Sequence, residues 1–288
     1  MIQDAAGTTH VPVAADAVLR IVSLVPSLTE LLCEMGLQAQ LVGRTGFCVH
    51  PRDQVQSIAK IGGTKDVNVK KIRALAPTHL VVNIDENEQP TVAALAQFIP
   101  NVIVTHPQTP RDNLTLYRLF GNLFGAVGNV AVRAAALESA FEEAYRALAT
   151  SGAGSGQAPH KTVLYCIWQD PWMTVAPQTY IGQMLALIGW RQWQAAGQDV
   201  APHSAGSLRY PCFAWSDGLI STIDEVVLST EPYRFTQAHA DSLERQIGKP
   251  VQLVDGEMLS WYGSRAIAGL RYLATLKQVS GAQSISRD

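Results

Sequence analysis

The sequence predicts an α/β protein with two lobes, each built on a mainly parallel sheet, joined by a single long helix. In both halves, short apolar runs alternate with helical patterns, which is typical of parallel sheets. Between the halves, residues 129–150 contain neither Gly nor Pro, and apolar side chains recur there at spacings of three and four. We therefore expect an N-terminal lobe at 1–125, a connecting helix and Gly/Ser loop at 126–160, and a C-terminal lobe at 161–288.

The first half follows this pattern closely. We expect strands at 20–25, 41–43, 78–83 and 101–105, and a helix at 90–98. Ser27 and Glu30 have the spacing of a capping box, so Ser27 is expected to cap a short helix. Asn68 is suited to cap a second helix that reaches Leu75, and Pro77 prevents its extension.

The second half repeats the alternation. We expect strands at 162–168, 173–176, 225–229 and 251–255, and helices at 179–189, 236–246 and 264–276. All six tryptophans lie after residue 160. Trp168 and Trp190 are expected in the core. Trp172, Trp215 and Trp261 lie in loops after strands, where packing and a ligand-facing position are both open, because ligands gather at the carboxyl ends of parallel strands.

Composition and charge exclude several classes of protein. The chain has 288 residues, 47% apolar and 16% charged, so it can build a sizeable core. Its formal net charge is −2 and no basic stripe is visible, which argues against nucleic acid as a partner. No apolar run reaches 18 residues, so no transmembrane helix is predicted. The first residues do not resemble a secretory signal, so we expect a cytoplasmic protein as written, or a periplasmic one if a leader has been removed.

No local motif for catalysis or for a metal is present. The four cysteines form no C-x-x-C pair; Cys33 and Cys166 are expected in the core, and the roles of Cys48 and Cys212 stay open. The run 62–65, Gly-Gly-Thr-Lys, is only part of a phosphate loop. The sequence therefore does not predict an enzyme, although a site assembled from distant loops would leave no local mark.

The turn at 254–265, VDGEMLSWYGSR, is unusually rich in functional side chains for a connector between a strand and a helix. Glu257 can accept hydrogen bonds from ligand amides, and Trp261 and Tyr262 can offer flat faces to a macrocycle. Arg265 lies in the first turn of a helix, where a cation is poorly placed for the helix dipole, so we expect it to have another partner: Glu257, Asp255 or a ligand carboxylate. The alternative is a capped turn with a buried Trp261 and a pairing of Arg265 with an acid.

Five stretches resemble one known group of proteins. They are RIVSLVPSLTELL at 20–32, VGRTGFCVHP at 42–51, IGGTKDVNVKKIRALAPTHLVVN at 61–83, PWMTVAPQTYIGQMLALIGW at 171–190 and LSTEPYRF at 228–235. These resemble the helical-backbone metal-receptor superfamily, the class III substrate-binding proteins, and most closely its cobalamin-binding branch. The resemblance covers residues 20–276. It implies two α/β lobes on a single helix, with a corrinoid (vitamin B12-like) ligand or a related metal chelate held in a cleft between the lobes for an ABC importer.

The resemblance also implies a set of ligand-facing residues. His50 falls on a tyrosine that precedes a proline, Tyr210 on a tryptophan that precedes a proline, Glu257 on an acid and Arg265 on an arginine. A further aromatic of the family falls near Trp172 or Met173. The expected ligand-binding residues are Cys48, His50, Thr64, Trp172, Tyr210, Glu257, Trp261, Tyr262 and Arg265. An imidazole ligates cobalt or iron well, so the resemblance makes His50 a candidate axial ligand.

The sequence departs from the family pattern in two places. Thr64 stands where the cobalamin binder has a second tryptophan, so one stacking surface is missing. Lys70 and Lys71 stand on the helix that carries a docking glutamate in importer members, and lysines would not pair with arginines on a permease. A permease partner is therefore doubtful. The acidic run Asp85-Glu86-Asn87-Glu88 is either part of the cleft rim or a solvated loop.

Two functions follow. The first is a monomeric solute-binding protein with no intrinsic cofactor that holds a corrinoid, in preference to an anionic ferric siderophore, since only Arg44, Arg209 and Arg265 are convenient cations. The alternative is an intracellular enzyme or chaperone that handles a metal or tetrapyrrole on the same scaffold. Its candidate metal ligands are Cys48, His50, Cys212 and Glu257.

Overall fold

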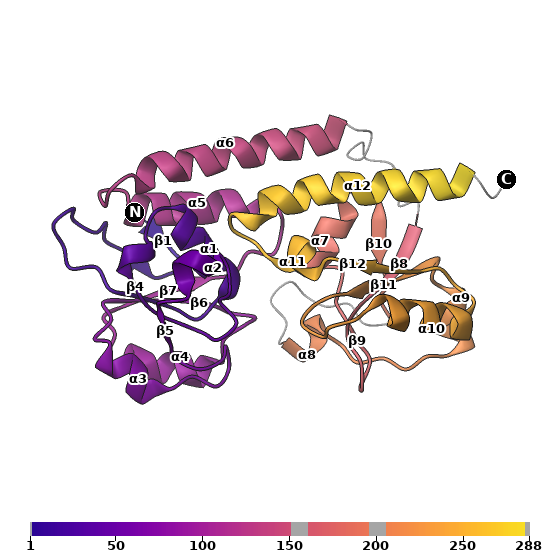
Figure 1. The fold of residues 1–288 in the computed structure, drawn as a ribbon, viewed down its shortest axis with the longest axis horizontal. Helices are drawn as coiled ribbons and strands as arrows, with labels where there is room; N and C mark the ends of the chain where they lie inside the picture. Colours follow the sequence, from indigo (N-terminus) through magenta and orange to yellow (C-terminus); the bar gives the residue numbers. More distant parts are fainter. Residues whose placement is uncertain (1, 151–160, 196–205, 286–288) are drawn as a thin grey trace. The chain divides into compact units, whose positions relative to one another are not determined.

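The computed structural model describes residues 2–150, 161–195 and 206–285, and the chain divides into two compact units (Figure 1). The first unit comprises Met1–Pro107, Arg111–Phe141 and Tyr262–Arg265. The second unit comprises Gln108–Pro110, Glu142–Trp261 and Ala266–Asp288. The division falls within the long helix α6, Val130–Leu148, which occupies the predicted position.

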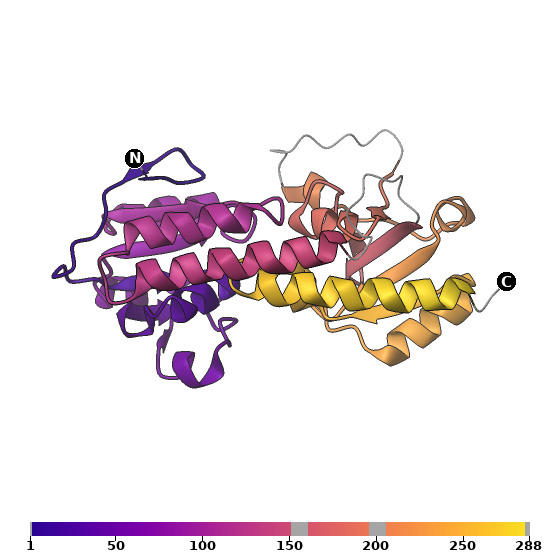
Figure 2. The same cartoon turned by 90° about the horizontal axis from the view of Figure 1, so that it is seen from above.

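The first unit is built on a five-stranded parallel sheet of order β5-β4-β3-β6-β7. Its strands are β3 Ile21–Ser23, β4 Leu41–Arg44, β5 Ala59–Lys60, β6 His79–Asn83 and β7 Asn101–Thr105. Two further strands, β1 Ile2–Gln3 and β2 Thr9–His10, form an antiparallel pair. The helices are α1 Pro26–Glu34, α2 Arg52–Val55, α3 Val69–Ala74, α4 Gln89–Ala96 and α5 Asp112–Leu123, with a short 3-10 turn at Gln38–Gln40. Figure 2 shows α5 beside α6, where Arg118 donates to Glu138.

The two helix starts predicted in this unit had different outcomes. Asn68 caps α3, and its side-chain oxygen accepts a hydrogen bond from the backbone N–H of Lys71 at 2.9 Å, as predicted. The prediction for Ser27 was wrong, because α1 begins two residues earlier than expected, at Pro26, with Val25 at the cap position and no side-chain cap. Proline is suited to the first helical position, since its fixed φ matches the helix and its missing N–H would be unpaired there in any case.

The second unit repeats the architecture with β10-β8-β11-β12 in parallel and β9 antiparallel to β8. Its strands are β8 Lys161–Trp168, β9 Met173–Thr174, β10 Trp190–Gln192, β11 Glu225–Ser229 and β12 Val251–Val254. Its helices are α7 Tyr180–Ala186, α8 Gly206–Arg209, α9 Asp217–Ser221, α10 Gln237–Ile247 and α11 Gly256–Ser260. The last helix, α12 Arg265–Ile285, follows α11. The α/β class with mainly parallel sheets, predicted from the alternation, is confirmed.

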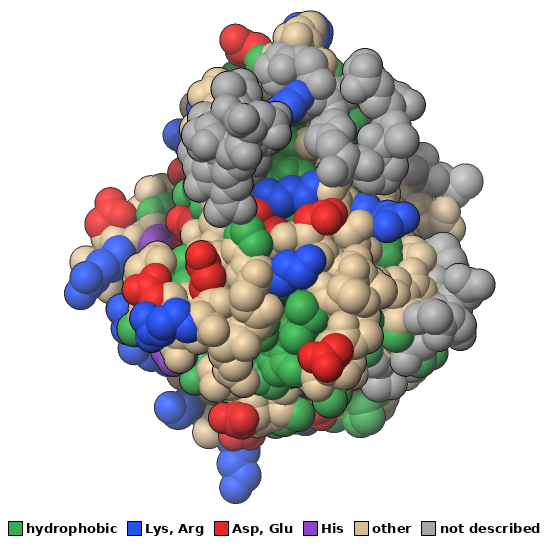
Figure 3. Space-filling model, turned by 90° about the vertical axis from the view of Figure 1, so that its right-hand side faces the viewer, with side chains coloured by type: hydrophobic (Ala, Val, Ile, Leu, Met, Phe, Trp, Pro, Cys, Tyr) green, Lys and Arg blue, Asp and Glu red, His purple; other side chains and the backbone are tan. Residues whose placement is uncertain are grey.

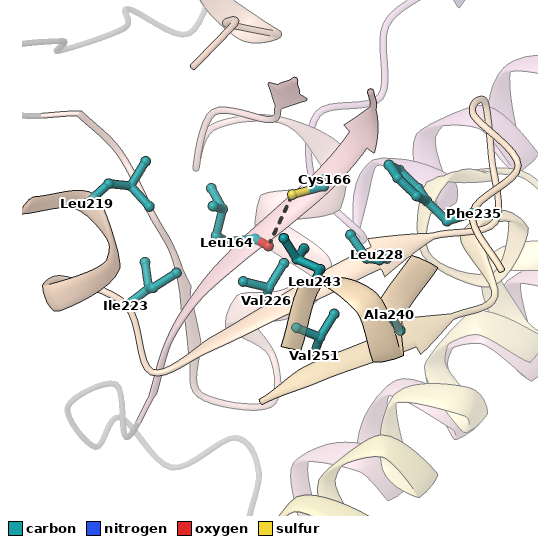
Figure 4. Close-up of a cluster of buried hydrophobic side chains, with 10 residues drawn as sticks. All are labelled: Leu164, Cys166, Leu219, Ile223, Val226, Leu228, Phe235, Ala240, Leu243 and Val251. Atoms are coloured by element: carbon teal, nitrogen blue, oxygen red, sulfur yellow. Dashed lines mark hydrogen bonds between the residues drawn. The ribbon is translucent and has the colours of Figure 1, made fainter. Parts of the chain in front are cut away.

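Alternate residues of β8 and β11 contribute to one buried hydrophobic cluster of the second unit (Figure 4). The buried side chains of this cluster are Leu164, Cys166, Leu219, Ile223, Val226, Leu228, Phe235, Ala240, Leu243 and Val251. Cys166 is therefore a core thiol, as predicted, and so is Cys33 in the first unit. Trp190 is buried as expected, but the prediction for Trp168 was wrong, since this last residue of β8 is 39% exposed.

The surface and the helices agree with the bulk composition. Over the face drawn in Figure 3, acidic and basic side chains are interspersed with polar and hydrophobic ones. This mixture fits a chain whose formal net charge is −2. Among the residues that the structure describes, no helix has the length and apolar character needed to cross a membrane.

Candidate ligand-binding site

The carboxyl ends of β8, β11 and β12 meet at one edge of the sheet in the second unit, because these strands are parallel neighbours. The loops that leave them begin after Trp168, Ser229 and Val254. In open parallel sheets, ligands bind outside this edge. The edge is therefore the place to look for binding groups in this unit.

A pocket of about 370 Å³ lies at this edge. Its lining consists of Thr230, Glu231, Leu253, Val254, Asp255 and Glu257. The lining therefore contains two aliphatic residues, three residues with carboxyl groups and one with a hydroxyl. The predicted ligand contact Glu257 is part of this lining, whereas Glu231 was missed, because the sequence alone does not show that the loop after β11 lies against the turn after β12.

Backbone contacts hold these two loops together. The N–H of Gly256 donates to Thr230 Oγ1 at 2.9 Å. A Cβ at position 256 would lie 2.3 Å from Ser229 Oγ and 2.9 Å from the backbone nitrogen of Glu231, so only glycine fits there. Asp255 caps α11, and its Oδ1 accepts from the N–H of Glu257 at 3.1 Å. These contacts fix where the Glu257 backbone stands relative to Glu231.

Glu231 has an unusual environment. Burial raises the pKa of its carboxyl above the ordinary value, and the nearby charges of Glu257 and Asp255 act in the same direction. Hydrogen bonds from Ser260, whose Oγ lies 2.5 Å from Oε1, and from Trp261 oppose the shift in pKa. The pocket therefore concentrates acidic groups, and at least one of them can hold its proton more firmly than a free glutamate.

The last four residues of the turn at 254–265, Tyr262–Arg265, belong to the first unit and pack against it. Gly263 has φ +82°, a conformation that favours glycine, and its N–H donates to Asn113 Oδ1 at 2.6 Å. Its carbonyl accepts from the Tyr117 hydroxyl at 2.9 Å. The hydroxyl of Tyr262 donates to Glu86. Trp261, at 7% exposed, and Tyr262, also at 7%, are buried, so this structure does not present either ring as an open face.

Arg265 forms an ion pair with Glu30, an acid that the sequence did not suggest as its partner. Nε of Arg265 lies 2.8 Å from Oε2 of Glu30, and Nη2 lies 2.6 Å from Oε1. Both side chains are 13% exposed. A local sequence pattern could not show this pair, because the two residues are 235 positions apart.

The loop after β4 contains two of the predicted residues. Cys48 is fully buried, and its sulfur lies 3.1 Å from the hydroxyls of both Thr29 and Thr45. Burial raises the pKa of the Cys48 thiol, so it is a packed thiol and not an exposed ligand. His50, two residues on, is half-buried.

Phe47, in the same loop, is a candidate that was missed. It is 63% exposed, and a Cβ placed on Gly63 would lie 3.5 Å from its ring. An exposed aromatic ring therefore lies beside the segment that contains Thr64, the position where the family's second tryptophan is missing. Phe47 is part of the run VGRTGFCVHP, but the sequence does not show that this loop lies beside the segment that contains Gly63 and Thr64.

The acidic run at 85–88, which follows β6, makes specific contacts with neighbouring loops of the first unit. It is therefore not a freely solvated loop. Asn87 is buried; its Oδ1 accepts from Asn83 N at 2.9 Å, and its Nδ2 donates to the Thr64 carbonyl at 3.0 Å. Asp85 lies 3.4 Å from Nε2 of His106. These contacts tie the ends of β6 and β7 to the loop that carries Thr64.

The remaining predicted residues of the second unit are Trp172, Tyr210 and Cys212. Trp172 is half-buried and stacks on Phe235 with ring centroids 5.8 Å apart, and its edge meets Trp215 at 5.4 Å. Tyr210 is half-buried, and Cys212 is exposed. Trp172 therefore packs in an aromatic cluster beside the core while keeping part of its surface open.

No metal cluster supports the alternative reading. Within 2–150, 161–195 and 206–285, no group of three or more His, Cys, Asp or Glu side chains is placed to hold a metal ion. Of the candidate metal ligands, Cys48 is enclosed by the hydroxyls of Thr29 and Thr45. Lys70 and Lys71 are both exposed on α3.

Two α/β units with parallel sheets, and an acidic pocket at the carboxyl edge of one, define a two-lobed binding protein. Residues 21–208 match the family described as "Periplasmic binding protein", which is about two thirds of the chain. This chain belongs to the periplasmic binding protein family. The resemblance to class III substrate-binding proteins is thereby confirmed. No curated protein sequence matches the chain.

Solved structures show the same fold. The periplasmic vitamin B12 binding protein BtuF of Vibrio cholerae is 19% identical, with 91% of this chain and 97% of that chain covered and a TM-score of 0.69. The periplasmic heme-binding protein RhuT from Roseiflexus sp. RS-1 in apo form is also 19% identical, with 90% and 97% covered and a TM-score of 0.69. S. aureus IsdE complexed with heme is 15% identical, with 90% and 98% covered and a TM-score of 0.65. The expected two-lobe α/β fold is confirmed.

Proposed function

We propose that this solute-binding protein holds a corrinoid, a macrocyclic cobalt chelate whose rim carries amide groups. The observation that carries the proposal is the set of three carboxyl groups in the pocket of the second unit, Glu231, Asp255 and Glu257. Membership of the periplasmic binding protein family supports binding of a solute, and similar folds bind vitamin B12 or haem.

The charge of the pocket favours one class of chelate over another. Carboxylates accept hydrogen bonds from amide N–H groups, and such charged hydrogen bonds contribute about 1.5–3 kcal/mol each. Haem presents carboxylates, and ferric siderophores are anionic, so the same groups would repel them. An amide-bearing macrocycle offers N–H donors to these carboxyl groups.

His50, in the first unit, is proposed as an axial ligand to the metal. It is half-buried, and a neutral imidazole is a good ligand for cobalt or iron. If hydroxocobalamin binds, the visible bands of the bound ligand should shift, and His50→Ala should remove the shift. An unchanged spectrum in the variant would exclude coordination by His50.

The test of the function is a titration of the purified protein with hydroxocobalamin, haem and a ferric siderophore, followed by visible spectra and calorimetry. We expect hydroxocobalamin to bind most tightly. Glu257→Gln should weaken its binding by about 1–3 kcal/mol, the range of a lost charged hydrogen bond. Asp241→Asn, which changes an exposed acid on α10 away from the pocket, is the matched control and should bind as the wild type does. Tight binding of haem with no binding of hydroxocobalamin would overturn the proposal.

A further inference from the structure

Trp168, the last residue of β8, lies in the open at the carboxyl edge of the second sheet. It is 39% exposed, although Leu164 and Cys166 of the same strand are fully buried. The pairing of β8 with β9 shifts register between Cys166 and Trp168, so Trp168 lies beyond the regular part of the strand. A large aromatic side chain left exposed at a ligand-binding edge calls for an explanation.

The position of Trp168 is held by its neighbours. Its ring meets Tyr233 edge to face, with ring centroids 5.5 Å apart and an interplanar angle of 76°. The backbone N–H of Tyr233 donates to the carbonyl of Ile167 at 3.3 Å, which holds the loop after β11 against the end of β8. We call Trp168 and Tyr233 the aromatic ledge. Tyr233 also packs against Phe235, with centroids 4.5 Å apart, so the ledge has support from the core.

The aromatic ledge and the acidic pocket belong to the same edge of the same sheet. β11 pairs with β8 on one side and with β12 on the other. Neighbouring strands lie about 4.8 Å apart, so the ends of β8 and β12 are roughly 10 Å apart. Glu231 lines the pocket, and Tyr233 of the ledge is two residues further along the same loop. A broad, flat ligand whose rim reaches the pocket can therefore lay its face on the ledge, whereas a small chelate can occupy only one of the two.

We infer that Trp168 is a stacking residue that gives this protein its preference for flat macrocyclic chelates, with Tyr233 as the residue that positions its ring. The inference rests on the proposed function and adds to it a contact that depends on the face of the ligand and not on its rim. Stacking on a tryptophan face is insensitive to the pattern of amides or carboxylates around the ring. Trp168 therefore selects for the macrocycle, and the carboxyl groups select among macrocycles.

The test compares Trp168→Leu and Trp168→Phe in titrations with hydroxocobalamin. Trp168→Leu should weaken binding about 5- to 10-fold, and Trp168→Phe, which keeps an aromatic face, about 2-fold, from the size of aromatic pair energies. The thermal midpoint should change little in both, because the side chain is already partly exposed. Ligand-induced quenching of tryptophan fluorescence should be smaller in Trp168→Phe than in the wild type at equal occupancy.

Trp193→Phe is the matched control, since Trp193 is half-buried and donates to Thr222 away from the ledge. It should bind as the wild type does. If the wild type binds and Glu257→Gln weakens binding while Trp168→Leu binds as tightly as the wild type, the ledge does not contact the ligand and this inference is wrong although the proposed function stands. Failure of the wild type to bind any macrocycle overturns both.

Discussion

Arg265 and Glu30 form a two-pronged ion pair between the first turn of α12 and helix α1, with N–O distances of 2.8 and 2.6 Å. Both side chains are largely shielded from water, at 13% exposed. Removing one partner leaves the other charge without compensation in a poorly hydrated place, so Arg265→Ala should lower the free energy of unfolding by about 3 kcal/mol. Urea denaturation measures this change.

The control for that experiment is Arg118→Ala. Arg118 pairs with Glu138 in a similar geometry but is 58% exposed, and the loss should be about 1 kcal/mol or less. If Arg265→Ala proves as stable as the wild type but binds hydroxocobalamin poorly, Arg265 contacts the ligand, as the family resemblance implies, and its pairing with Glu30 contributes little to stability.

His79 should make the fold sensitive to acid. Burial, assisted by the charge of His10, lowers the pKa of His79 from 6.5 to about 4. Between pH 4 and pH 6.5, His79 is protonated in the unfolded chain but neutral in the folded protein. The free energy of unfolding therefore decreases as the pH falls from about 6.5 towards 4. His79→Leu cannot titrate at this position. Relative to the wild type it should gain stability on acidification from pH 7 to pH 4, as urea denaturation at several pH values would show.

The difference between His79→Leu and wild type should stay constant between pH 7 and pH 8, where the imidazole is neutral in both states. This range is the internal control for any effect of the new side chain on packing. A difference that does not change between pH 7 and pH 4 would mean that His79 titrates with the same pKa in the folded and unfolded protein.

A thiol reagent should find one reactive cysteine in the folded protein. Cys212 is exposed, whereas burial raises the pKa of Cys33 to about 12 and also raises those of Cys48 and Cys166. Ellman's reagent should therefore titrate one thiol quickly in buffer and all four in urea. Cys212→Ser should abolish the fast phase; a fast phase that survives would show that one of the buried thiols is accessible.

Phe47 is predicted to contribute to ligand binding and little to stability. Its side chain is 63% exposed, so Phe47→Ala should change the free energy of unfolding by less than about 1 kcal/mol. Loss of its aromatic face should weaken hydroxocobalamin binding about 3- to 10-fold. Val132→Ala, at a 71% exposed position on α6, is the control and should affect neither quantity. Equal affinities of Phe47→Ala and wild type would mean that this ring does not replace the missing tryptophan.

The elements could be predicted because local patterns determine them. Strand β11 lies at 225–229, as its short apolar run had predicted, and Asn68 caps α3. The wrong prediction at Ser27 also has a local cause. The capping-box spacing favours a helix that begins after Ser27, whereas proline favours the first position of a helix, and α1 begins at Pro26. Trp168 was misassigned because a strand pattern does not show where the core that covers it ends.

The site could be predicted only in part, because contacts between loops that are distant in sequence leave no local signal. The turn at 254–265 was recognised as unusual from its composition, and Glu257 does line a pocket. Its second acid, Glu231, and the ring beside Thr64, Phe47, both come from other loops. The role of Arg265 as the partner of Glu30 required knowledge of where α1 lies.

Four residues near the end of the chain, Tyr262–Arg265, belong to the first unit, although the chain has left that unit at Phe141. They carry the Gly263 contacts to Asn113 and Tyr117 and the Arg265 pair with Glu30. During synthesis, the ribosome must add about 120 further residues before this segment exists. At about 5–20 residues per second, the delay is on the order of 10 s. Throughout that interval, the Arg265 guanidinium that pairs with Glu30 and the Gly263 N–H that donates to Asn113 have not yet been synthesised. The first unit therefore cannot complete its folding before most of the second unit has been translated.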